Sequence, residues 1–200
     1  MTHFKYAPID KDVSIFASGD SLKEIPIEKL EQIKQKTFVI SLNSVNGIVP
    51  HMRIWADDWW SDYFEKQPKE SLYVTRPLAF KNTKEYDIEI DYWFDNRREG
   101  FKDGNWTIYW LLQLLRKHFP DKKVYIFGMD CKKGDDRSKR YKNGQLEEVR
   151  WSRQKNHLKE LPWALERHNN DHPEFLKNVY NCNPQSEVKC IEFMDFHRIL

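Results

Sequence analysis

Short apolar runs that are rich in β-branched residues are the feature that most constrains this fold. Residues 37–42 read TFVISL, with apolar side chains on both faces of any strand they form. That pattern is typical of a strand in a parallel sheet that is covered on both sides. Residues 13–18 (VSIFAS) and 123–127 (KVYIF) suit the same kind of buried strand. Further strands are predicted at 52–56, 71–75 and 188–194.

Helical patterns separate these runs. Ser21 and Glu24 have capping-box spacing, so a helix is predicted to start there. Alternatively, Pro26 opens a helix over 25–36. Residues 105–118 form the clearest helix and are apolar nearly all round, which predicts burial. Other helices are predicted to start at 59 and to lie within 162–180. Strands alternating with helices predict an α/β fold with a single doubly wound, mostly parallel, Rossmann-like sheet.

Length and charge limit the organisation of the chain. Its 200 residues fit one domain over 1–200. The polar, basic segment 132–160 is predicted to be a lid or loop of that domain. Residues 81–104 are predicted to form an excursion over one edge of the sheet. The net charge of +2 means that any role with nucleic acid needs a local patch. That patch is predicted within the basic segment, at Lys132, Lys133, Arg137, Lys139, Arg140, Lys142, Arg150, Arg153, Lys155 and Lys159.

The sequence also predicts where the chain works. No apolar run reaches membrane-spanning length, and the N-terminus lacks the apolar core of a signal peptide. The three cysteines have neither zinc nor redox spacing, which favours reduced thiols in a cytoplasmic protein. The oligomeric state is left open by the sequence.

Polar and small residues follow several of the predicted strands. In doubly wound sheets, ligands bind beyond the carboxyl ends of the strands, near the point where the strand order reverses. That rule gathers four segments into one predicted site: Ser18–Ser21, Asn43, Asp57–Asp58 and Gly128–Asp130. The segment SGDS is an ordinary strand-to-helix turn or a loop whose small residues and backbone N–H groups bind phosphate.

The order of these motifs resembles one group of enzymes. The motifs are IFASGDSL, VISLNSV, PHMRIWADDWW, a buried helix leading into KVYIFGMD, and VYNCNPQS. Together they are similar to the bacterial sialyltransferases of the Campylobacter lipooligosaccharide type and to the related 6-hydroxymethylpterin pyrophosphokinase-like proteins. The resemblance spans most of residues 13–187 and rests on order and spacing, since no single motif is specific.

The resemblance implies a site for a cytidine nucleotide sugar. Gly19 and Ser21 would line the phosphate or ribose, and Asn43 would contact the nucleotide. The remaining donor-binding positions implied by the resemblance are Ser18, Asp20, Thr107, Gly128, Asp130, Asn181, Asn183 and Ser186. Asp20 departs from the proline usual in the family, and it either faces the ligand, caps the next helix or points to solvent. His157 is the best match to the catalytic base and Tyr141 to the active-site tyrosine, with His51, His118 and His168 as competitors.

Asp57 and Asp58 allow two interpretations. An acidic pair after a strand can hold a divalent ion on a diphosphate, and it can equally cap the following helix. A monophosphate sugar donor requires no metal cofactor, whereas pyrophosphoryl transfer from ATP requires Mg²⁺.

Three functions therefore follow from the sequence. The first is a glycosyltransferase that moves a sugar from a CMP-sugar-like donor to a hydroxyl of a glycan or a modified nucleic-acid base. The second is a Mg²⁺-dependent pyrophosphokinase acting on a small alcohol. The third is a non-catalytic domain of the same fold that binds nucleic acid or protein.

Overall fold

A parallel sheet forms the centre of the molecule. The computed structural model describes residues 2–43, 48–55, 70–75, 87–89, 107–131, 137–142, 145–150 and 154–200, without side chains at 2, 75, 89, 137–142, 145–150 and 154–159. Nine strands of these residues lie in the order β1 (Thr2–His3), β6 (Ile88–Glu89), β5 (Leu72–Thr75), β4 (Met52–Ile54), β3 (Phe38–Leu42), β2 (Val13–Phe16), β7 (Val124–Phe127), β10 (Val179–Asn181) and β11 (Glu192–Phe193). Every pair of neighbours is parallel.

The strand order reverses next to β2. From β2 the chain adds β3, β4, β5 and β6 on one side, then returns to place β7, β10 and β11 on the other side. The topological switch point therefore lies between β2 and β7, where Ile15 pairs with Ile126 and Phe16 with Phe127. The predicted α/β fold with one doubly wound, Rossmann-like sheet is confirmed.

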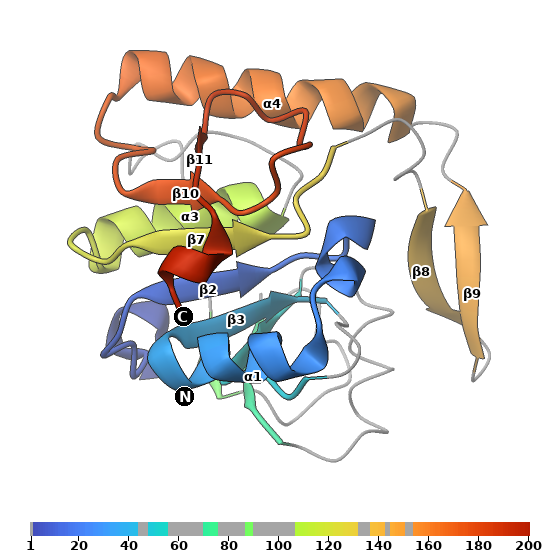
Figure 1. Ribbon diagram of the computed structural model, residues 1–200, viewed down its shortest axis with the longest axis horizontal. Coiled ribbons are helices and arrows are strands. Elements are labelled where there is room, and N and C mark those ends of the chain that lie inside the picture. Colours follow the sequence, from blue (N-terminus) through green and yellow to red (C-terminus); the bar gives the residue numbers. More distant parts are fainter. Residues whose placement is uncertain are drawn as a thin grey trace.

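Helices cover both faces of this sheet (Figure 1). Helices α3 (Thr107–His118) and α4 (Gln154–Asp171) lie over one face, and α1 (Ile27–Lys36) lies over the other. Alternate strand residues divide between the two layers because successive side chains point to opposite faces. Ile15 and Ile126 thus join the core under α3, whereas Phe16 and Phe127 join the core under α1.

The predicted buried helix at 105–118 is confirmed over the described residues of α3, where Ile108 to Leu115 are all buried. The capping-box prediction is wrong. Asp20–Glu24 is a short 3₁₀ helix, η2, which begins after Gly19 without a side-chain cap. The alternative is confirmed, since α1 begins at Ile27 directly after Pro26. Ser21 does not cap η2 because its hydroxyl donates a hydrogen bond to the carboxylate of Asp130 instead.

The C-terminal elements differ from the prediction. Helix α4 ends at Asp171, and the last residues of the range predicted to be helical, 179 and 180, belong to strand β10 (Val179–Asn181). Asn178 has a left-handed backbone with a φ of 58°, which turns the chain out of the preceding turn and into the strand. Only Glu192–Phe193 of the strand predicted at 188–194 pairs with β10.

The predicted lid contains regular structure. Strands β8 (Arg137–Lys142) and β9 (Gln145–Arg150) form an antiparallel hairpin in which Arg137 lies opposite Arg150 and Lys139 opposite Glu148. The first residues of α4 also belong to this segment. In Figure 1 the hairpin lies off the side of the sheet to which β2, β3 and β7 point. Its role as a lid stays a prediction.

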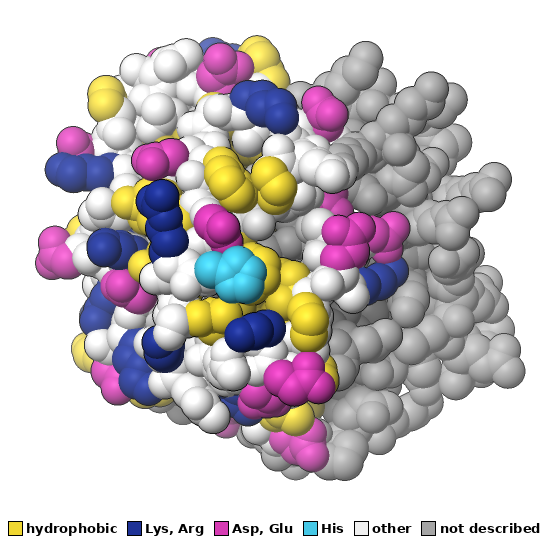
Figure 2. Space-filling model, in the orientation of Figure 1, with side chains coloured by type: hydrophobic (Ala, Val, Ile, Leu, Met, Phe, Trp, Pro, Cys, Tyr) yellow, Lys and Arg dark blue, Asp and Glu magenta, His cyan; other side chains and the backbone are white. Residues whose placement is uncertain are grey.

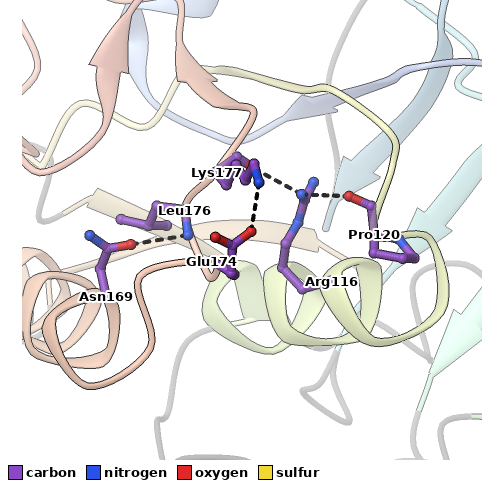
Figure 3. A network of polar contacts seen from close by, with 6 residues as sticks. All are labelled: Arg116, Pro120, Asn169, Glu174, Leu176 and Lys177. Carbon is purple, nitrogen blue, oxygen red and sulfur yellow. Dashed lines mark hydrogen bonds and ion pairs between the residues drawn. The ribbon is translucent and has the colours of Figure 1, made fainter.

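Arg116 fastens the amino ends of β7 and β10 (Figure 3). It lies in the last turn of α3, where its Nη1 donates to the carbonyls of Pro120 at 3.0 Å and Lys177 at 2.8 Å. Its Nη2 donates to the carbonyl of Lys122 at 2.7 Å. A cation near a helix carboxyl end also interacts favourably with the helix dipole.

None of the helices in the described ranges is long and apolar enough to cross a membrane.

Candidate functional site

Two loops touch at the switch point. The backbone N–H of Gly19, after β2, donates to the carbonyl of Gly128, after β7, at 2.9 Å. A Cβ atom on Gly19 would lie 2.8 Å from the carboxylate carbon of Asp130 and closer still to the Gly128 carbonyl. Gly128 has a φ of 72°, in the region that favours glycine. Both glycines are therefore required by the close approach of the two loops.

Asp130 joins a third loop to these two. Its Oδ2 accepts the backbone N–H of Ser21 at 2.9 Å, and its Oδ1 accepts the Ser21 hydroxyl. The same Oδ1 accepts Nδ2 of Asn183, after β10, at 2.6 Å. Asp130 is only 4% exposed. A buried carboxylate is tolerated when it is hydrogen-bonded in this way, so Asp130 holds three loops together.

The bonds to Asp130 bear on the phosphate interpretation of the SGDS loop. A phosphate there would need the N–H and hydroxyl of Ser21, and both are engaged by the chain's own carboxylate. The negative charge of Asp130 also disfavours a second anion beside it. The arrangement therefore suits an uncharged part of a ligand, such as a ribose or a base, better than a phosphate at Ser21.

Asn181 and Ser186 form further hydrogen bonds to the backbone of the same loops. The Oδ1 of Asn181 accepts the backbone N–H of Asn183 at 3.1 Å. The hydroxyl of Ser186 donates to the Met129 carbonyl at 2.7 Å and accepts the N–H of Val188 at 3.1 Å. Both residues are buried. The predicted residues after β10 thus lie beside Gly128–Asp130, and their hydrogen bonds fix the loops in place.

Cys182, between these asparagines, is a buried thiol. Burial, helped by the negative charge of Asp195, raises its pKa to about 12. Since the thiolate is the reactive form, this cysteine is not a nucleophile at neutral pH.

Two polar atoms at the end of β3 have no hydrogen-bond partner among the described residues. They are Oδ1 of Asn43 and Oγ of Ser41. Ser41 is fully buried, and Asn43 takes a left-handed backbone with a φ of 55° while its N–H donates to the Ile54 carbonyl at 2.9 Å. Buried polar atoms are nearly always hydrogen-bonded, so such exceptions indicate a bound group or a function.

Ser41 was missed by the sequence analysis. The available signal was a hydroxyl residue inside the otherwise apolar run TFVISL. Ser41 pairs with Phe16 in the neighbouring strand, so it lies near the carboxyl end of β2. Asn43 follows two residues later, at the end of β3.

Three further predicted residues lie at the rim of this region. Ser18 is exposed, and Asp20 points to solvent and forms an ion pair with Lys23. The solvent alternative for Asp20 is therefore confirmed. Thr107 is the first residue of α3 and is half-buried.

The predicted catalytic and metal residues are only partly described. Tyr141 lies on β8 and His157 in the first turn of α4, where the structure describes the backbone alone. Asp57 and Asp58 lie outside the described residues. Within the described ranges, no three histidine, cysteine or acidic side chains are arranged to hold a metal ion.

No protein-family model, curated protein or solved structure matches this chain. Any function proposed for the chain therefore depends on the residues of the site.

Proposed function

We propose that this protein is a glycosyltransferase that binds a nucleotide-activated sugar beyond the carboxyl ends of β2, β3 and β7. The observation that carries the proposal is the pair of unpartnered acceptors, Asn43 Oδ1 and Ser41 Oγ, beside the topological switch point. Ligands of doubly wound sheets bind at that position. A ribose hydroxyl or an exocyclic amine of a base would supply the donor that the Asn43 oxygen lacks.

The charge distribution supports a division of the site. Asp130 makes the region next to Gly19 and Ser21 suitable for the neutral nucleoside. The phosphate then belongs nearer to the hairpin. Its strands carry more basic than acidic residues, with Glu147 and Glu148 against Arg137, Lys139, Arg140, Lys142 and Arg150. On the described part of the face in Figure 2, basic and acidic side chains are interspersed, which contrasts with the basic composition of the hairpin. The resemblance described above favours cytidine as the base and no resident metal.

The proposed reaction is a direct displacement. The oxygen of an acceptor hydroxyl, on a glycan or a modified base, attacks the anomeric carbon of the sugar. The bond from that carbon to the phosphate oxygen breaks, and the nucleoside monophosphate leaves. His157 takes the hydroxyl proton as general base, because its unperturbed pKa near neutrality suits that step. Tyr141 is proposed to contact the leaving phosphate.

A thermal-shift screen with CMP, CDP, UDP, GDP and ATP, each with and without Mg²⁺, tests the binding step. A nucleotide at one hundred times its dissociation constant stabilises by about 2.7 kcal/mol. We expect stabilisation by CMP that does not depend on Mg²⁺. An ATP shift that requires Mg²⁺ would instead support the pyrophosphokinase. Nucleic-acid binding that falls steeply with salt, without any nucleotide shift, would support the non-catalytic domain.

Asn43→Gly tests the carrying observation directly. Glycine accepts the left-handed backbone, so the variant removes the amide without adding backbone strain. Asn178→Gly is the matched control, since Asn178 also has a left-handed φ but lies before β10, at the opposite end of the sheet. We expect about tenfold weaker CMP binding for Asn43→Gly alone. Equal losses in both variants would remove Asn43 from the site.

A second measurement separates binding from catalysis. Release of CMP from a CMP-sugar, with water as the acceptor, is followed by ³¹P NMR. We expect His157→Gln to slow this release by at least about a hundredfold while CMP still binds. Unchanged release in this variant would assign the base to another residue, and no release by the unmodified protein would refute the transferase.

A further inference from the structure

A cavity lies at the other end of the sheet. It has a volume of about 700 Å³ and lies where the chain enters β2, β3, β4, β5 and β6. Its lining includes Lys11, Lys34, Phe38, His51 and Ser71. This is the amino end of the strands, so the cavity is separate from the site at the switch point and does not depend on the proposed function.

His51 is held in one orientation in this cavity. Its Nδ1 accepts the backbone N–H of Val39 at 2.9 Å. Its ring stacks on Phe38, with 5.0 Å between ring centroids and an angle of 21° between planes. Because Nδ1 acts as an acceptor, the proton of the neutral ring is on Nε2. His51 therefore offers a fixed N–H donor on the edge of the ring that faces away from β3.

Cations surround this donor. Burial is the largest cause that lowers the pKa of His51, and the positive charges of Lys34 and then Lys11 lower it further. Asp10 opposes them with a smaller effect. Lys34 is half-buried on α1, and Lys11 donates to the Gln35 carbonyl at 2.9 Å. The immediate field at His51 is therefore positive.

The other acids of the cavity do not cancel this field. Asp87 lines the cavity, but its Oδ2 already accepts the N–H of Tyr73 at 2.8 Å. Glu70 is exposed to solvent. Asp10 and Glu70 are exposed, so their charges are screened by water more strongly than the charge of the half-buried Lys34.

Ser71 provides an independent indication of a ligand. Its hydroxyl oxygen is buried and has no hydrogen-bond partner among the described residues, and the residue is part of the cavity lining. We propose that this cavity binds a small molecule through an anionic group, a phosphate or a carboxylate, held by the Nε2–H of His51 and the ammonium groups of Lys34 and Lys11.

Binding at this site depends on pH. A bound anion favours the imidazolium form of His51, so it raises the pKa of that ring. Affinity therefore increases as the pH falls through the pKa of His51, whose value in the free protein lies below 6.5. The carboxylates of Asp10, Glu70 and Asp87, which line the same cavity, limit the increase because they repel an anion.

The test uses the full chain and two probes, inorganic phosphate and acetate, with sodium chloride as the ionic-strength control. Binding is followed through the imidazole ¹⁵N signals of His51. We expect a saturable shift that strengthens from pH 7.5 to pH 5.5, and the probe that binds more tightly identifies the anion. If neither phosphate nor acetate gives a saturable shift beyond that of chloride, the site is refuted.

Three variants locate the anion. Lys34→Gln is expected to weaken probe binding by about tenfold. Lys36→Gln is the matched control, because Lys36 lies on the same helix, is exposed and does not line the cavity. Equal weakening in both would mean a general charge effect and would overturn the proposal. His51→Asn keeps an acceptor for the Val39 N–H and removes the Nε2 donor. Binding to this variant is followed through the side-chain signal of Lys34, because the imidazole is absent. We expect the variant to bind the probe about tenfold more weakly.

Discussion

Asp130 and Arg116 have the same structural role at opposite ends of the sheet, with opposite charges. At the carboxyl ends of β2, β7 and β10, Asp130 accepts an N–H, a hydroxyl and an amide. At the amino ends of β7 and β10, Arg116 donates to three carbonyls. One of the three donors to Asp130 is a backbone N–H and two are side chains, whereas all three acceptors of Arg116 are backbone carbonyls of the turns that precede β7 and β10. Each charge thus has the sign that the groups around it require.

The two ends differ in what they leave for a ligand. At the carboxyl end the polar groups of Ser21, Asn181 and Asn183 are used internally, whereas Oδ1 of Asn43 and Oγ of Ser41 lack partners among the residues that the structure describes. At the amino end, His51 faces a cavity with its second nitrogen. Pre-organised loops and an open cavity are thus found at opposite ends of one sheet.

Removing the Asp130 carboxylate should have the largest effect. Asp130→Ala leaves three donors without their partner in a buried place, and we expect a loss of about 3 to 4 kcal/mol in the free energy of unfolding. Asp130→Asn keeps the shape and one acceptor, so its loss should be smaller. Urea denaturation measures both. A change below about 0.5 kcal/mol for Asp130→Ala would show that the three loops do not depend on this residue.

Gly19→Ala should separate the two loops while Asp130 itself stays unmutated. Its Cβ would meet the Gly128 carbonyl and the Asp130 carboxylate, so the loops must move apart. We expect a loss of about 2 kcal/mol in the free energy of unfolding and weaker CMP binding. Ser18→Ala, at the exposed neighbouring residue, is the control for stability and should leave the free energy of unfolding unchanged. Wild-type stability in Gly19→Ala would contradict the close approach of these loops.

Arg116→Met tests the amino end. The variant removes the hydrogen bonds to three carbonyls and keeps an unbranched apolar side chain at this position of α3. We expect a loss of about 1.5 kcal/mol in the free energy of unfolding, measured by chemical denaturation. CMP binding should be unchanged, since Arg116 lies away from the switch point. Arg116→Lys should not restore the stability, because an ammonium group lacks the forked donors of a guanidinium. If Arg116→Lys had the stability of the unmodified protein, the positive charge of Arg116 alone would account for its effect.

The smallest effect concerns Cys182. Its pKa is raised to about 12 from an ordinary value of 9.0, so the unfolded chain releases this proton first as the pH rises. The stability that results is present below pH 9 and is lost as the pH rises from about 9 to 12. We expect iodoacetamide at pH 8 to leave Cys182 unmodified in the native protein and to alkylate it in urea. Equal rates by mass spectrometry in both states would show that this thiol is accessible.

Much of the fold could be predicted from local sequence. TFVISL and KVYIF are apolar on both faces, which only a strand inside a covered sheet can use. The helix at Thr107–His118 is apolar nearly all round, so its burial followed in the same way. Pro26 indicated the start of α1, because proline is tolerated at the beginning of a helix and disfavoured in its interior.

The errors arise where a distant contact outweighs a local preference. Ser21 has capping-box spacing, but the carboxylate of Asp130, 109 residues away, takes both its hydroxyl and its N–H. Residues 179 and 180 lie in a predicted helical range, but pairing with β7 makes them part of a strand. Spacing along the chain carries no information about either partner.

The sequence by itself determined the strand and helix order, and with it the end of the sheet where polar residues gather. Those properties depend on the periodicity of side chains over a few residues. The tertiary structure decided that Asp130 occupies the donors of Ser21 and that His51 lines a cavity at the amino ends of the strands. It also left the oxygens of Asn43 and Ser41 without a partner among the described residues. These depend on which groups meet across the sheet, because a polar group is available to a ligand only when no other part of the chain has satisfied it.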